Sequence, residues 1–128
     1  GEGLRCAPTL YDAARVVVHY SRLQATTAGD GGMALAQLPL HEVRALLNAD
    51  PDAVCVAGEN GPQTTLISGR PAALDAIVRV LRERGFFAAR IDVNIAAHSP
   101  QMDPILDPLR HALVGICPQP AQVPMLST

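Results

Sequence analysis

The stretch "AVCVAGENGPQTTLISG", residues 53–69, decides the fold of this chain. Residues 53–59 and 64–69 are apolar runs, and the second is rich in β-branched side chains, which favour strands. Between them, Asn60 and Gly61 are followed by a proline, a combination that favours a reversal of the chain. The stretch therefore predicts two antiparallel strands joined by a tight turn.

The segments on both sides of this hairpin continue the alternation of elements. Apolar residues at intervals of three and four predict two helices, and Gly85 is placed to end the second. The expected elements are a strand at 33–38, a helix at 40–49, the hairpin strands, a helix at 70–85 and a strand at 86–95. Residues 32–95 thus predict β-α-β-β-α-β, a ferredoxin-like unit with two helices on one face of an antiparallel sheet.

Helices are expected before and after this unit. Thr9 can cap a helix over residues 9–23, because Asp12 three positions later completes a capping box. Ser99 can cap a later helix, which Pro108 is expected to kink or to shorten at its start. The remaining expected elements are a glycine-rich connecting loop at 25–32, a loop at 117–122 and a short strand at 123–127.

Composition excludes several classes of function. The 128 residues suffice for one domain with a core, and 48% hydrophobic residues argue against disorder. A net charge of −2 and 3% aromatic residues disfavour a nucleic-acid surface, which needs clustered cations and often stacking rings. No apolar run approaches the roughly 18 residues that a membrane span requires, and no signal peptide is visible. We therefore expect a cytoplasmic protein that binds neither nucleic acid nor membrane.

The cysteines and histidines do not predict a metal site. Cys6, Cys55 and Cys117 are far apart, without C-x-x-C spacing, so buried free thiols in a reducing cytosol are the expectation. No two histidines are spaced H-x-x-x-H. His98 stands out, because it lies between the last predicted strand and a capped helix. Spacing alone leaves two interpretations of His98, a catalytic base and an ordinary loop histidine.

Several ordered blocks of the sequence resemble a known family. These blocks include "YDAARVVVHYSRL", "VAGENGPQTTLISG", "LRERGFFAARIDV", "AAHSPQMDPILDPLRHAL" and "VPMLST". They are similar to acyltransferase domains of modular type I polyketide synthases and, more distantly, to malonyl-CoA:acyl-carrier-protein transacylases. The resemblance covers about residues 7–128 and implies an α+β fold. Residues 1–31 and 96–128 would then belong to a hydrolase-like large subdomain, and residues 32–95 to an inserted ferredoxin-like small subdomain.

The resemblance implies a transfer in two steps. In this family a serine takes an acyl group from acyl-CoA and passes it to the phosphopantetheine thiol of an acyl carrier protein, with a histidine as base. The family's histidine ends a four-residue motif that reads "IAAH" here, so His98 matches the base. The serine of the family's G-H-S-x-G elbow is expected outside this chain, which alone would be inactive. No bound cofactor is implied, and the partners would be the carrier protein and neighbouring synthase domains on the ketosynthase side.

The same resemblance suggests residues that bind the substrate. Tyr20 occupies the position where extender-selective members carry an arginine that pairs with a carboxylate, which favours an uncharged starter acyl group here. Ile95 and Ala97 belong to the "IAAH" motif, and the small Ala97 leaves room for a longer or branched acyl chain. Asn60 and Gln101 match family positions near the cleft.

Two other functions remain open at this stage. The tyrosine at the arginine position and Pro108 also fit an inactive acyltransferase remnant that serves as a scaffold or as a docking surface for a carrier protein. A free-standing ferredoxin-like binding domain is the third interpretation. It would fail if the strand at 123–127 pairs with a sheet that this chain does not contain.

Overall fold

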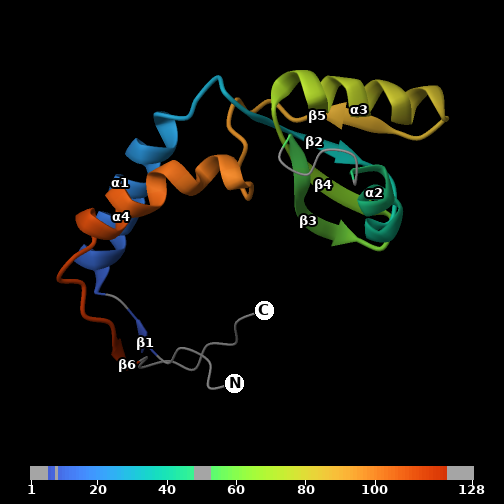
Figure 1. Cartoon of the computed structure of the whole chain (residues 1–128). Helices are drawn as coiled ribbons and strands as arrows, with labels where there is room; N and C mark the ends of the chain where they lie inside the picture. The colour runs from blue at the N-terminus through green and yellow to red at the C-terminus, as the bar shows by residue number, and fades with distance from the viewer. Residues whose placement is uncertain (1–5, 8, 48–52, 121–128) are drawn as a thin grey trace.

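The computed structural model describes residues 6–7, 9–47 and 53–120, with the backbone alone for residues 6, 7 and 120. Figure 1 shows two parts, a helical part and a part built on a four-stranded sheet. The chain runs from the helical part into the sheet and then returns. The two segments that connect these parts, one at Gly29 and the other at Asn94, lie side by side, because the Gly29 amide donates to the Asn94 carbonyl at 2.8 Å.

The sheet has the strand order of a ferredoxin-like unit. Its strands are β2 (Gly32–Ala36), β3 (Val54–Gly61), β4 (Thr64–Gly69) and β5 (Ala88–Arg90). They lie in the order β3-β4-β2-β5, and every neighbouring pair is antiparallel. Ala34 of β2 stands opposite Ile67 of β4 on one side and Arg90 of β5 on the other. This arrangement confirms the α+β fold and the ferredoxin-like unit expected from the sequence.

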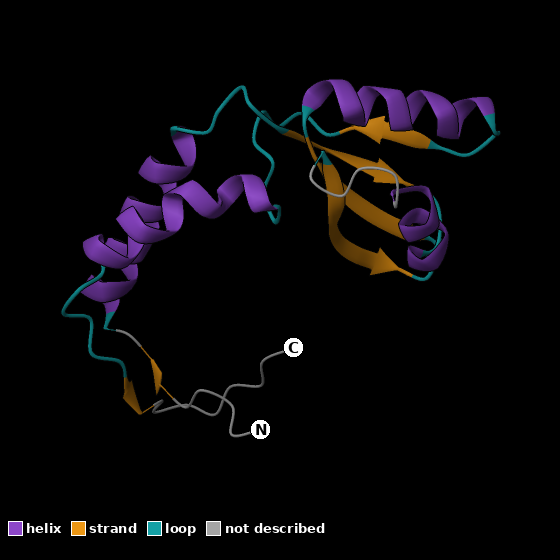
Figure 2. Ribbon diagram, in the orientation of Figure 1, coloured by secondary structure: helices purple, strands orange, loops and turns teal. Residues whose placement is uncertain are grey.

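Two helices cover one face of this sheet (Figure 2), α2 (Leu40–Leu47) and α3 (Pro71–Glu83). Both helices bury their apolar residues in a single cluster with the strands, which places them on the same face. Pro71 opens α3 at its first turn, where the missing N–H is not needed. The buried cluster consists of Ala34, Ala36, Leu38, Val43, Leu47, Val54, Ile67, Leu74, Val78, Leu81 and Ala88.

The opposite face of the sheet carries no helix in the described chain. Met33, Ser68 and Cys55 stand side by side across β2, β4 and β3 on this open face. Met33 and Cys55 are half-buried, whereas Ala34 and Ile67 on the covered face are fully buried. Ser68 between them is fully buried, so only the alternation along β2 cleanly separates a closed core from a more open surface.

The helical part consists of α1 (Leu10–Ala25), the 3₁₀ helix η1 (Pro100–Ile105) and α4 (Leu106–Ala112). The predicted capping box is confirmed, because the Asp12 amide donates to Thr9 Oγ1 at 3.1 Å and the Thr9 amide to the Asp12 carboxylate at 3.4 Å. Arg15 of α1 donates to the Ala112 carbonyl at 2.9 Å and to the Val114 carbonyl at 3.2 Å, so a cation lies at the carboxyl end of α4. This contact joins α1 and α4.

Prolines shape the start of the last helix as expected. Ser99 caps the segment, and its first turns are the 3₁₀ helix η1. Pro108 has no N–H to bond the carbonyl of residue 104, and its ring crowds that carbonyl, so regular α-helix begins only at Leu106. Pro108 then lies in the first turn of α4, where proline is tolerated.

Two predicted elements differ clearly from the structure, and a third lies outside its described residues. The strand expected at 86–95 is regular only over β5, because Asn94 turns away to bond Gly29. Part of the loop expected at 117–122 forms the short strand β6 (Gln119–Pro120), which pairs with β1 (Cys6–Ala7). The strand expected at 123–127 lies outside the described residues.

Candidate active site

His98 lies in a tight turn that the neighbouring residues hold by hydrogen bonds. Ser99 Oγ donates to the Ala96 carbonyl at 2.6 Å and accepts from the Gln101 amide at 3.2 Å. Within this turn His98 has φ +61°, the only positive φ of a non-glycine residue in the described chain. Strained positions of this kind persist only where the surroundings fix them, and they cluster at functional sites. The backbone thus favours a functional role for His98.

The turn places His98 against the open face of the sheet. The Cys55 thiol on β3 donates a long hydrogen bond to the His98 carbonyl, with an Sγ to O distance of 3.6 Å. The His98 side chain itself is exposed. The histidine therefore lies where the returning segment meets the uncovered strands, with its ring free to contact a substrate.

Cys55 itself is a poor nucleophile in this position. The thiol is half-buried, and burial raises its pKa above the ordinary value because it disfavours the charged thiolate. At neutral pH the protonated form predominates, and this is the form that donates to the His98 carbonyl. The contact is therefore a link between the sheet and the histidine turn rather than a second catalytic group.

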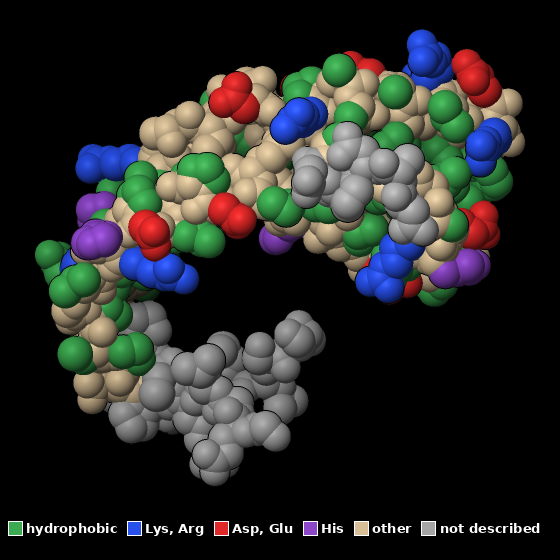
Figure 3. Space-filling model, viewed as in Figure 1, with side chains coloured by type: hydrophobic (Ala, Val, Ile, Leu, Met, Phe, Trp, Pro, Cys, Tyr) green, Lys and Arg blue, Asp and Glu red, His purple; other side chains and the backbone are tan. Residues whose placement is uncertain are grey.

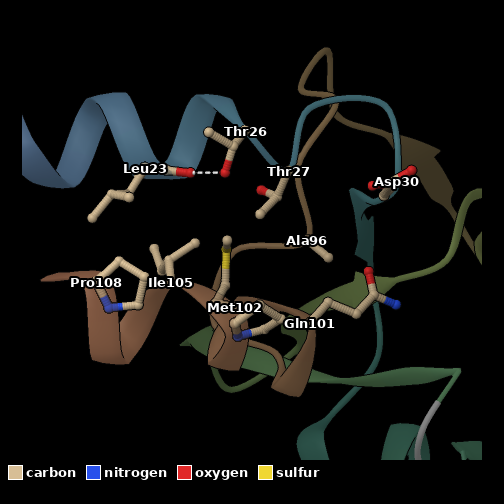
Figure 4. A pocket seen from close by; sticks show the side chains of 10 residues that line it. Leu23, Thr26, Thr27, Asp30, Ala96, Gln101, Met102, Ile105 and Pro108 are labelled. Atoms are coloured by element: carbon tan, nitrogen blue, oxygen red, sulfur yellow. Dashed lines mark hydrogen bonds between the residues drawn. The ribbon is translucent and has the colours of Figure 1, made fainter.

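A cavity of about 280 Å³ opens between the end of α1 and η1 (Figure 4). Leu23, Met102 and Ile105 form its apolar side, Thr26, Thr27 and Asp30 supply polar side chains, and Gln101 also lines it. Ala96 also lines it, so lining residues precede and follow His98 along the chain. A Cβ at Gly31 would collide with the Ala96 Cβ, so this glycine lets the two crossing segments close the edge of the cavity.

Gln101 has an unusual environment among the residues that line the cavity. Both its Oε1 and its Nε2 are buried and have no hydrogen-bond partner among the described residues. A buried carboxamide without partners is costly, because it loses its bonds to water. Gln101 is therefore the side chain of this region that most needs a further partner.

The structure brings together four of the predicted site residues. Ile95, Ala97, His98 and Gln101 lie on one short segment, and Gln101 also lines the cavity. Ile95 and Ala97 are half-buried beside the exposed His98. The roles assigned to them from the sequence stay predictions.

Two predicted residues lie apart from this group. Tyr20 is on α1, 40% exposed, and its hydroxyl accepts from Gln24 Nε2 at 3.1 Å. Asn60 is exposed at the hairpin turn, five residues along β3 from Cys55, which corresponds to roughly 16 Å at the rise of an extended strand. Neither residue lines the cavity, and a contact of Asn60 with a substrate near His98 requires an extended ligand.

Sequence reasoning missed two features of the site. The segment at 25–32 was expected to be only a connecting loop, yet Thr26, Thr27 and Asp30 line the cavity. Cys55 was not singled out for the site, and its contact with His98 joins residues far apart in the sequence. No local pattern predicts either feature, because both arise where the segment that follows β5 packs against elements distant in the sequence.

The described residues give no sign of a metal site or of a membrane span. Nowhere in these ranges do three or more histidine, cysteine or acidic side chains gather as metal ligands. Within the same ranges every helix is too short or too polar to cross a lipid bilayer.

Comparison with known sequences then decides the family, since the profile described as "Acyl transferase domain" matches residues 5–128. The chain belongs to this acyltransferase family. The relatives that it matches include polyketide synthases, and its solved neighbours include acyltransferase domains of such synthases, so the resemblance to the modular type I enzymes is confirmed.

Two relatives and one solved structure illustrate the match. Polyketide synthase GfsA of Streptomyces halstedii is 41% identical over 124 residues, which cover 95% of this chain and 2% of that protein. The phthioceranic/hydroxyphthioceranic acid synthase of Mycobacterium bovis is 38% identical over 117 residues, covering 91% of this chain and 6% of the relative. The crystal structure of the acyltransferase domain from module 8 of the salinomycin polyketide synthase superposes with a TM-score of 0.90 at 38% identity, covering 95% of this chain and 29% of the other. The acyltransferase chain thus spans only a small part of each of these proteins.

Proposed function

We propose that this chain is part of an acyltransferase that loads an acyl group from acyl-CoA onto an acyl carrier protein through an acyl-serine intermediate. The observation that carries the proposal is the position of His98, which is exposed, held at φ +61° and joined through its backbone carbonyl to Cys55 on the open face of the sheet. The family membership supplies the class of reaction.

His98 acts as the general base in this mechanism. Its imidazole takes the proton of the serine hydroxyl as the oxygen attacks the thioester carbonyl of acyl-CoA, and it returns the proton to the departing CoA thiolate. In the second half-reaction it deprotonates the carrier protein's phosphopantetheine thiol, which attacks the acyl-serine carbonyl. The ester C–O bond then breaks, and His98 returns the proton to the serine oxygen, which regenerates the hydroxyl. The nucleophilic serine belongs to a segment outside this chain, so this chain supplies the base and part of the binding surface.

The acyl group is uncharged in this proposal. Tyr20 takes the place of the family's arginine, and its hydroxyl already accepts a hydrogen bond from Gln24. A tyrosine offers no positive charge to a malonyl-type carboxylate. Ile95 and the small Ala97 beside His98 would contact the acyl chain, and Asn60 would contact the extended part of the CoA or carrier arm.

The proposed partners follow from the reaction. The acyl carrier protein brings the phosphopantetheine thiol, and neighbouring synthase domains on the ketosynthase side hold the acyltransferase in the assembly. No cofactor is consumed, and the acyl-CoA is the substrate. We place the reaction in the cytoplasm, where acyl-CoA is found.

A second candidate is an inactive acyltransferase remnant that serves as scaffold or docking surface. The observation in its favour is Tyr20 at the position of the family's arginine, where the hydroxyl accepts from Gln24 Nε2 at 3.1 Å and the side chain offers no positive charge.

Acylation of the protein separates the two candidates. The experiment compares this chain with a longer chain that includes its native upstream segment, after incubation with acetyl-, propionyl-, malonyl- or methylmalonyl-CoA. Intact-mass spectrometry is expected to show an acetyl or propionyl adduct on the longer chain alone. Absence of any adduct on the longer chain would overturn the transfer proposal and leave the remnant.

A matched pair of variants tests the role of His98. His98→Asn in the longer chain keeps a residue that tolerates positive φ but removes the base, so the rate of acylation is expected to fall by about 10²–10⁴-fold. His111→Asn makes the same change at an exposed histidine of α4 and is expected to leave the rate unchanged. An equal rate for His98→Asn and the parent chain would refute the base.

A further inference from the structure

The backbone of His98 is joined to the sheet by a side chain of β3. The Cys55 thiol donates to the His98 carbonyl, with an Sγ to O distance of 3.6 Å, although the two residues are 43 positions apart. A thiol is a weak donor, so one contact of this kind contributes little to the stability of the whole fold. Its effect is local, because the carbonyl that it holds belongs to the residue with φ +61°.

The bonds made by Ser99 hold the turn around His98 but leave its carbonyl free. Ser99 Oγ donates to the Ala96 carbonyl and accepts from the Gln101 amide. The direction of the His98 carbonyl depends on the ψ angle of that residue, and the Cys55 thiol restrains this angle. Because Cβ and the carbonyl carbon are attached to the same Cα, the bonds of Ser99 and of the thiol together fix the direction of the Cα–Cβ bond, from which the imidazole extends.

The sheet gives the Cys55 side chain a firm position. Cys55 pairs with Ser68 on the central strand β4, and Ser68 is fully buried, with its Oγ donating to the Gly32 carbonyl at 3.4 Å. The other face of these strands is closed by the buried cluster. Burial raises the pKa of the Cys55 thiol, so the proton that it donates is retained at neutral pH.

We infer that Cys55 is a positioning residue for the transfer, whose thiol holds the His98 backbone so that the imidazole points in the direction that proton transfer requires. This inference rests on the proposed function, in which His98 is the general base. A general base must lie within hydrogen-bond reach of the proton that it takes, and a misplacement of about 1 Å can lower a rate by about 10²-fold. Cys55 itself touches neither the serine nor the acyl group in this mechanism and acts through His98.

Acylation kinetics of the longer chain test this role, with the acyl-CoA that gives the larger adduct. Cys55→Ala removes the thiol, and the maximal rate of acylation is expected to fall about threefold to tenfold, as for the loss of one neutral hydrogen bond. The acyl-CoA concentration that gives half the maximal rate should stay the same, because the lost contact orients the base and does not bind the substrate. Cys117→Ala makes the same change at an exposed cysteine and is expected to leave both quantities unchanged.

Cys55→Ser distinguishes positioning from packing. Its hydroxyl is a better donor than a thiol but lies on a shorter bond, so it is expected to recover part of the rate that Cys55→Ala loses. Packing alone would not separate the two variants in this way, since serine and alanine are both smaller than cysteine. Equal maximal rates in Cys55→Ala and the parent, equal losses in the two variants, or a change in the half-saturating concentration alone would overturn the inference.

A spectroscopic measurement on the same longer chain needs no turnover. An HNCO spectrum correlates the carbonyl carbon of His98 with the amide of Ser99. A carbonyl that loses a hydrogen bond moves upfield, so this resonance is expected to move upfield in Cys55→Ala, to move less in Cys55→Ser and to stay in place in Cys117→Ala. An identical His98 carbonyl resonance in Cys55→Ala and the parent would show that the thiol does not hold it and would overturn the inference.

The two measurements separate this inference from the proposed function. An acyl adduct that forms at the same rate in Cys55→Ala and the parent refutes the positioning role and leaves the transfer intact. A His98 carbonyl that responds to Cys55→Ala, without any adduct on the parent, supports the hold of Cys55 on His98 and refutes the transfer.

Discussion

Two cysteine side chains that the structure describes lie in different environments. Cys55 is half-buried on the open face of the sheet, and burial raises its pKa, whereas Cys117 is exposed. Alkylation by iodoacetamide requires the thiolate.

In a Cys6→Ser background we expect Cys117 to be modified first. The rate at Cys55 should keep rising with pH beyond the range of an ordinary thiol, because its raised pKa leaves less thiolate at each pH. Peptide mass mapping between pH 7 and pH 10 measures both rates, and equal rates throughout would contradict the assignment.

Single residues show how far local sequence allows inference. Apolar neighbours suggested buried thiols, which is wrong for Cys117 because the turn after α4 leaves it at the surface. His98 was singled out first by its place between a predicted strand and a capped helix and then by a family motif, and the structure adds a positive φ that neither reveals. Gln101 matched a family position without a role, since its buried amide and its cavity depend on packing against α1.

At the scale of elements, the first helix depends on its cap. Thr9 Oγ1 accepts from the Asp12 amide at 3.1 Å, and the Asp12 carboxylate accepts from the Thr9 hydroxyl at 2.7 Å. None of the residues of α1 is buried, so little packing compensates for a lost cap. Thr9→Ala is expected to lower the stability of α1 by about 1 kcal/mol, seen as reduced helicity in circular dichroism during urea titration.

Ser21→Ala on the same helix is the matched control for the cap. Its side chain is exposed in the interior of α1, where alanine is the better helix former, so helicity should be kept or slightly raised. A loss of helicity in Ser21→Ala equal to that in Thr9→Ala would mean that the cap contributes nothing specific.

Elements with strong periodicity were predicted better than their ends. The spacing of apolar residues in α3 predicted which side chains face the core, and Leu74, Val78 and Leu81 are buried as predicted. The hairpin strands were also located from composition and turn residues, although β3 runs on to Gly61. The strand expected at 86–95 was too long, because apolar residues continue beyond Arg90 while the backbone leaves the sheet to meet the loop before β2.

At the scale of the whole molecule, burial is uneven. Every residue of the buried cluster lies between Ala34 and Ala88, inside the ferredoxin-like unit. Outside that unit α1 exposes large apolar side chains, among them Leu10 at 88%, and Figure 3 shows hydrophobic side chains on the surface of the helical part. We interpret this surface as one that the rest of the acyltransferase covers, in keeping with the assignment of residues 1–31 and 96–128 to a large subdomain.

Hydrogen exchange of this chain tests that interpretation. Amides of the central strands β2 and β4 are bonded on both sides and lie above a closed core, so they should exchange only on global unfolding. Amides of α1 should exchange orders of magnitude faster through local opening, since the helix buries none of its residues. Restoring the upstream segment should slow exchange in α1 and leave β4 unchanged. If α1 in this chain exchanges as slowly as β4 at every protein concentration, its apolar surface is already covered, and the division into a stable unit and a dependent helical part is wrong.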